Sequence, residues 1–223
     1  MKAMLYADWM NFRQSLRSIL FVMVVFAIAA FVWSGPMFFL FTVVFLSIMV
    51  PTTLFSADQA YGWNRLSLSL PILRRDVVGS KFLMGLLINL GLLVISTVLT
   101  VVYYRVSAAG GSPDALMESL AGILACEAVA VLMMGVLMVL SIKFGIDKAR
   151  YIIMACVWVP VLGVFVLEKL PWFEAALHAA GNWLNALRAG QIVTLLAGAF
   201  VVSLAVYALC YLISVKVYQK TEL

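Results

Sequence analysis

The chain has 223 residues, of which 65% are hydrophobic and 11% charged, and its mean hydropathy is +1.12. Soluble domains are roughly half apolar and a quarter charged, so this composition excludes a soluble globular protein. The net charge of +5 does not indicate a nucleic-acid partner, because the basic residues gather at the ends of apolar segments, as orientation signals do. Without a Pro/Gly/Ser-rich linker, we expect a single all-α transmembrane domain over residues 1–223.

The first residues have the pattern of a surface helix. Within 2–16, the apolar residues Leu5, Trp9, Phe12 and Leu16 follow one another at helical spacing, and polar residues occupy the other positions. One apolar stripe on an otherwise polar helix is typical of a segment lying along a membrane surface. We therefore predict an N-terminal amphipathic interfacial helix.

Several apolar segments that follow are long enough to cross a bilayer, which takes about 20 residues. The predicted spans are 17–33, 36–56, 82–104, 117–142, 151–167 and 191–215. The fifth is short and contains Pro160 and Gly163, which predict a kink that neighbouring helices cover. This pattern predicts a six-span protein with both termini on one side.

The basic residues indicate which side that is. Twelve of the fifteen lie on the side of the termini: Lys2, Arg13, Arg17, Arg65, Arg74, Arg75, Lys81, Lys143, Lys148, Arg150, Lys216 and Lys220. The other side holds only Arg105, Lys169 and Arg188. Because cytoplasmic loops are enriched in Lys and Arg, we predict that both termini are cytoplasmic.

On the opposite side, segment 171–188 mixes aromatic residues with polar ones and is too polar to span. We expect it to lie in the interface or to enter the membrane partway as a re-entrant helical hairpin covered by protein. Its aromatic residues Trp172, Phe173 and Trp183 are candidates for an outer gate.

The chain lacks the motifs of common enzymes. It has no GxxxxGK[ST] phosphate-binding loop, so we expect no ATP hydrolysis by that route. Its one histidine, His178, excludes a metal site built on several histidines. We therefore expect no catalytic residue, no metal and no cofactor held by this chain, and no enzymatic activity of its own.

Glu127 is the clear ionisable residue inside a predicted span. Such residues are costly in hydrocarbon and often functional, so Glu127 is a candidate for the substrate path, for proton relay or for pairing with Arg105 or Arg188. The alternative is a carboxyl group bonded within the bundle. Asn89 belongs to a stripe of small and polar residues on the third span, for which helix packing competes with a polar translocation path.

The polar interruption between the second and third spans carries a more specific pattern. It contains Trp63, then Ser-Leu-Pro at 69–71, Arg-Arg-Asp-Val-Val at 74–78, and Lys81-Phe82. These residues resemble the signature of small permeases of the type-2 ABC exporter class, a Trp-containing stretch followed by SLP-x-x-R-[KR]-[DE]-[IV]-V-x-x-K-[YF]. In this chain Leu73 replaces the serine that commonly precedes the basic pair.

A second match, Lys-Phe-Gly-Ile-Asp-Lys-Ala-Arg-Tyr at 143–151, resembles the family's turn between spans four and five. The resemblance implies a coupling helix around 57–70 that contacts a separate cytoplasmic ATPase. Carried over, the contact residues are Gly62, Trp63, Asn64, Arg65, Leu66 and Ser67. Asp147, Lys148 and Arg150 are candidates for a second cytoplasmic contact. Trp63 beside Arg65 has the composition of an interface hot spot. The alternative for Trp63 is that it anchors the chain at the membrane surface. We interpret Arg74, Arg75 and Lys81 as orientation charges.

The resemblance implies a permease subunit of an ATP-driven exporter in the bacterial plasma membrane. It would assemble as a homodimer or a heterodimer with a similar permease, with ATP and Mg bound by the partner ATPase and no nucleic acid involved. A peptide or an amphipathic molecule suits entry from the membrane, although the side chains do not distinguish a peptide from a drug or a lipid. The alternatives are a secondary transporter driven by an ion gradient through Glu127, and a membrane scaffold or sensor.

Overall fold

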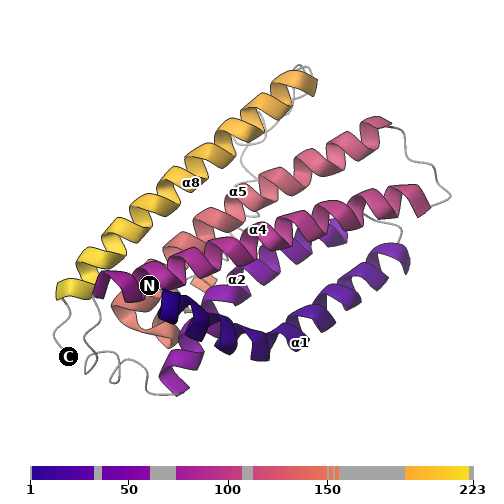
Figure 1. Ribbon diagram of the computed structural model, residues 1–223. Helices are drawn as coiled ribbons and strands as arrows, with labels where there is room; N and C mark the ends of the chain where they lie inside the picture. The colour runs from indigo at the N-terminus through magenta and orange to yellow at the C-terminus, as the bar shows by residue number, and fades with distance from the viewer. Residues whose placement is uncertain are drawn as a thin grey trace.

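The computed structural model describes residues 2–32, 37–60, 74–106, 113–149, 151–152, 154–155 and 189–220. Within them the secondary structure is helical and contains no strand. The helices are α1 (Lys2–Val32), α2 (Met37–Ala60), α4 (Arg74–Val106), α5 (Pro113–Phe144) and α8 (Ala189–Lys220). Figure 1 shows them side by side, with α1 beginning and α8 ending at the same end of the bundle.

Each of these five helices contains a stretch long and apolar enough to cross a membrane: Ser15–Val32, Phe38–Ser56, Arg75–Val106, Ala115–Phe144 and Thr194–Gln219. They correspond to five of the six predicted spans. Most of the other predicted span, 151–167, lies outside the described residues, as does the outer segment 171–188. The described part of the chain is therefore an all-helical protein with five candidate membrane spans.

The predicted surface helix over 2–16 is not a separate element. It is continuous with the first span in α1, and Figure 1 shows the helix changing direction after its first turns. The apolar stretch of α1 begins only at Ser15. At 1.5 Å per residue, thirty-one residues extend for about 46 Å, whereas hydrocarbon is about 30 Å thick. The first turns of α1 therefore have the length to project beyond the hydrocarbon.

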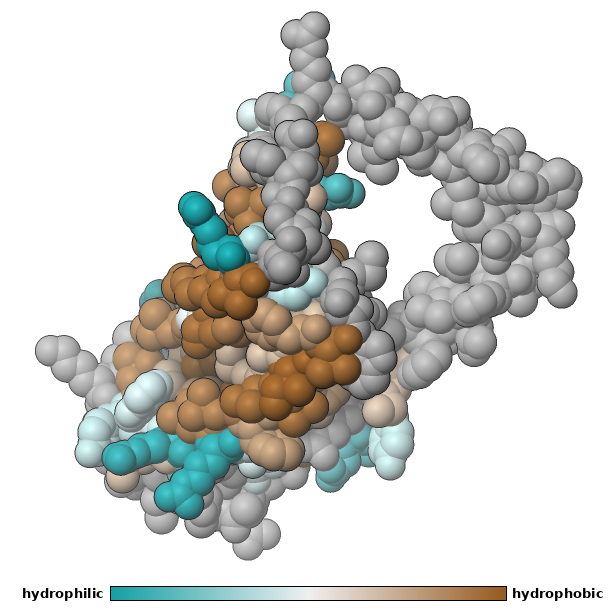
Figure 2. Space-filling view, turned by 90° about the vertical axis from the view of Figure 1, so that its right-hand side faces the viewer, coloured by the Kyte–Doolittle hydropathy of each residue, from teal (hydrophilic) through white to brown (hydrophobic). Residues whose placement is uncertain are grey.

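Exposed apolar side chains cover much of the bundle. On α1, Phe21 and Val32 are well exposed, and on α8 the same is true of Val201 and Val202. Figure 2 shows hydrophobic residues grouped over the middle of one face, with several hydrophilic residues gathered at its lower edge. A surface of this kind is stable in contact with lipid and not with water.

Tyr207 of α8 is the centre of the contact between α4, α5 and α8. Its hydroxyl donates a hydrogen bond to the Phe82 carbonyl of α4 at 2.8 Å, and the two rings pack with centroids 5.2 Å apart. Gly135 of α5 lies against the same ring, and a Cβ atom built there would stand 3.0 Å from Tyr207 Cδ2. Small residues allow this close approach of helices, which is a main source of stability inside a membrane.

Gly135→Leu is expected to destabilise the protein by about 1–3 kcal/mol, because the new side chain meets a buried aromatic ring that has little room to move. Unfolding of the purified protein in detergent measures the change. Gly198→Leu on α8 is the matched control, since a Cβ atom there has nothing within 4 Å. Equal stability of the two variants would show that Tyr207 does not constrain this contact.

Candidate functional site

Four polar residues meet where α1, α2 and α4 pack together near the end at which α1 begins. The Lys81 ammonium of α4 lies 3.3 Å from Asp8 Oδ1 of α1 and 2.5 Å from Asp58 Oδ2 of α2. The Ser80 hydroxyl is 2.9 Å from Asp8 Oδ2, to which it donates. All four side chains belong to buried residues. We call Asp8, Asp58, Ser80 and Lys81 the Lys81 cluster.

The Lys81 cluster places one cation between two carboxyl groups in a region shielded from water. Burial raises the pKa of the Asp58 carboxyl above its ordinary value, and the attraction of Lys81 opposes this rise. The ammonium also lies 5.3 Å from the centroid of the Phe55 ring, at a distance suited to a cation–π contact. The Lys81 ammonium therefore offsets the free-energy cost of burying the carboxyl groups of Asp8 and Asp58.

Lys81 has a structural role beyond that of an orientation charge, because the residue is only 4% exposed and is ion-paired. Neighbouring Arg75 is exposed, and its Nε donates to the Tyr211 hydroxyl at 3.3 Å. Arg74 is the first residue of α4. The helix therefore starts eight residues before the predicted start of the third span, and it includes the basic motif.

The Lys81 cluster also fixes the two ends of the predicted coupling segment. Residues 57–60 form the last turn of α2, and α4 begins at Arg74. The candidate contact residues Gly62, Trp63, Asn64, Arg65, Leu66 and Ser67 lie outside the described residues. Asp58 precedes them and Lys81 follows them, so one ion pair joins the helix that enters this segment to the helix that leaves it.

The second candidate contact lies at the end of α5. Gly145 interrupts the helix with φ of +80°, a left-handed conformation that glycine adopts without a Cβ penalty. A helical turn follows over 146–149, in which Ile146 and Ala149 are buried while Asp147 and Lys148 are exposed. The sequence motif at this point therefore builds a turn that presents two charged side chains to the outside. Arg150 lies outside the described residues.

A second polar group joins α2, α4 and α5 inside their membrane spans. The Asn89 amide of α4 donates to Glu127 Oε1 of α5 at 2.8 Å, and the Ser47 hydroxyl of α2 donates to Asn89 Oδ1. The Ser47 hydroxyl also lies 2.6 Å from the Val43 carbonyl. All three polar residues are 0% exposed. We call Ser47, Asn89 and Glu127 the Asn89 network.

Glu127 does not pair with Arg105, which is exposed near the far end of α4. Its partner in the described part of the chain is Asn89, and its Oε2 atom has none there. The sequence indicated both residues, but not their contact, nor the role of Ser47. The network therefore connects three helices and leaves one buried carboxyl oxygen without a hydrogen-bond partner in the described residues. The candidate gate residues Trp172, Phe173 and Trp183 lie outside the described residues.

Comparison with known proteins agrees with this architecture. The model of the family described as "ABC-2 family transporter protein" matches residues 3–219. No curated protein and no solved structure matches the chain. The family match covers all five described helices except the first residue of α1 and the last of α8, and it includes the Lys81 cluster, the Asn89 network and the two sequence motifs at 63–82 and 143–151. The chain therefore belongs to the ABC-2 transporter family and is a multi-pass membrane permease.

Proposed function

We propose that this chain is the membrane-spanning subunit of an ATP-driven exporter in a bacterial plasma membrane. Membership of the ABC-2 family implies a partner ATP-binding subunit in general. That partner would bind ATP and Mg, and this chain would supply the transport path without enzymatic activity of its own. Two permease chains, identical or similar, would enclose the path between them.

The observation that carries this proposal is the position of the Lys81 cluster. It joins the end of α2, the first part of α4 and the first turns of α1 around a single ammonium group. A push on segment 61–73, which connects α2 to α4, would therefore move three helices together. A tight connection of this kind is what a subunit needs if it is to turn the motion of an external motor into helix movement.

Trp63 and Arg65 would make the principal contact with the ATPase, and the exposed pair Asp147 and Lys148 would make a second one from the turn at Gly145. Both segments follow helices that end on the side where α1 begins. Closure of the ATPases on ATP would drive both contacts together. The cargo that fits a membrane-facing permease best is a peptide or another amphipathic molecule.

Trp63→Ala/Arg65→Ala is expected to abolish recovery of the ATPase with the tagged permease in detergent and to reduce vanadate-sensitive transport at least tenfold. Tyr6→Ala/Lys216→Ala is the matched control, because it also removes one aromatic and one basic side chain and both residues are exposed. The recovered partner must contain a GxxxxGK[ST] motif and hydrolyse ATP. Full transport by the Trp63/Arg65 variant, with no ATPase recovered by the wild type, would refute the proposal.

A further inference from the structure

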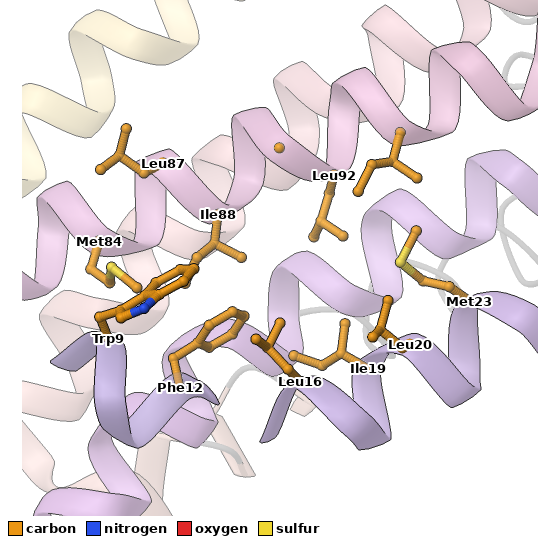
Figure 3. A pocket seen from close by; sticks show the side chains of 12 residues that line it. Trp9, Phe12, Leu16, Ile19, Leu20, Met23, Met84, Leu87, Ile88 and Leu92 are labelled. Atoms are coloured by element: carbon orange, nitrogen blue, oxygen red, sulfur yellow. The ribbon is translucent and has the colours of Figure 1, made fainter. Parts of the chain in front are cut away.

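A long apolar groove runs between α1 and α4. It has a volume of about 340 Å³, and its walls include Trp9, Phe12 and Met23 from α1 and Leu87, Gly91 and Ile95 from α4. Figure 3 shows Met84, Ile88 and Leu92 of α4 opposite the row of side chains on α1, with Trp9 at one end of that row and Met23 at the other. Apart from the Trp9 indole nitrogen, every lining side chain is apolar or absent.

The shape of the groove favours a single hydrocarbon chain as its occupant. From Trp9 to Met23, α1 rises about 21 Å at 1.5 Å per residue, so the volume is spread along a narrow channel. A helix from another protein is about 10–12 Å across and does not fit into such a channel. Leu20, Leu87 and Ile95 are each partly exposed, so the groove is open along its side, where lipid surrounds the spans.

Charge indicates the kind of lipid. Arg13 and Arg17 are exposed, lie on α1 beside the lining residues Phe12 and Leu16, and form no ion pair within the described residues. Because Cα–Cβ bonds tilt toward the start of a helix, the side chains at both positions leave the helix in the direction of the Trp9 end of the groove. An acidic headgroup at that end would meet two guanidinium groups, which bind phosphate well.

We propose that the groove is a binding site for an anionic phospholipid, with one acyl chain between α1 and α4 and the phosphate on Arg13 and Arg17. The site begins directly beside the Lys81 cluster, since Trp9 follows Asp8 and Met84 lies one turn after Lys81. The lipid therefore holds together the same two helices that Asp8 and Lys81 join. The proposal is independent of the substrate of the transporter.

Gly91 allows the groove to be filled without disturbing the fold. A Cβ atom at Gly91 has nothing within 4 Å, and the same is true at Gly198 on α8, outside the groove. Gly91→Leu therefore places a side chain in the channel, and Gly198→Leu adds the same side chain to another membrane helix. Both changes replace glycine by a better helix former, so neither is expected to reduce helix stability.

The test is native mass spectrometry of the full-length protein released from detergent, with phosphatidylglycerol or phosphatidylcholine of equal chain length added. Wild type and Gly198→Leu are expected to retain phosphatidylglycerol at least tenfold better than Gly91→Leu. Arg13→Gln/Arg17→Gln is expected to bind both lipids equally, whereas Lys143→Gln keeps the preference. Equal retention by the two glycine variants, no headgroup preference in the wild type, or a change of oligomeric state in Gly91→Leu alone would overturn the proposal.

Discussion

Lys81→Met is expected to lower the free energy of unfolding by about 3–5 kcal/mol, because it leaves the buried carboxyl groups of Asp8 and Asp58 without their cation. Methionine preserves most of the side-chain volume, so the loss reports on charge more than on packing. Lys148→Met, at an exposed position, is the matched control and is expected to change stability by less than about 0.5 kcal/mol. Chemical unfolding in detergent measures both variants.

The deficit of Lys81→Met is expected to depend on pH. Burial already raises the pKa of Asp58, so the folded state holds a proton there more tightly than the unfolded chain does. The stability that this proton contributes is present at low pH and is lost as the pH rises through the folded pKa. Without Lys81 the pKa of Asp58 rises further, so the deficit should shrink as the pH falls.

Lys81→Met/Asp58→Asn should recover part of the lost stability, since it removes one of the two unpaired acids. The double variant should still transport poorly, because α2 and α4 are no longer joined by an ion pair at the segment proposed to contact the ATPase. Normal transport coupled to ATP hydrolysis in the double variant would show that the Lys81 cluster stabilises the fold without transmitting motion.

Glu127→Leu is expected to cost about 1–3 kcal/mol of stability, because the buried Asn89 amide loses its acceptor. Adding Asn89→Leu should cost less than the sum of the two single changes, since both partners of the hydrogen bond are then gone. Thermal unfolding of the four proteins of this double-mutant cycle measures the coupling. Strict additivity would show that the bond between Asn89 and Glu127 contributes nothing.

Glu127→Gln separates the two candidate energy sources for transport. Glutamine retains the oxygen that accepts from Asn89 but cannot carry a proton or a negative charge. Under the proposed function we expect at least half of the wild-type transport and continued sensitivity to vanadate. Loss of transport in a folded Glu127→Gln protein, together with insensitivity to vanadate, would favour the transporter driven by an ion gradient.

Hydropathy and periodicity predicted the helical class and the five candidate spans of the described residues, because helix formation and hydrophobic length depend on local sequence. They placed the start of the third span at residue 82, eight residues after α4 begins, because the preceding segment contains three basic residues. The helix continues there because Val77, Val78 and Phe82 are buried and Lys81 is neutralised by acids on two other helices. The hydropathy of one segment does not reveal that its lysine is neutralised by acidic residues on other helices.

The same limit applies to the candidate site. Trp63 was predicted from its motif and lies outside the described residues, whereas Glu127 was indicated by its position within an apolar span. That Glu127 meets Asn89 and Ser47 depends on which helices are neighbours and on how each is rotated, and neither is contained in the spacing of apolar residues. Asp8 and Asp58 had one available signal, which is that they are acidic residues on the side of the chain richest in basic ones.

The order of synthesis gives the Lys81 cluster a place in the assembly of the protein. Asp8 leaves the ribosome 73 residues before Lys81, which is several seconds at about 5–20 residues per second. During that interval the first two spans can insert, but Asp8 and Asp58 still lack Lys81, the cation that pairs with both of them in the folded protein. The ion pairs of the Lys81 cluster can form only after α4 has emerged from the ribosome. The packing of α1, α2 and α4 around the cluster therefore has to wait until Lys81 has been synthesised.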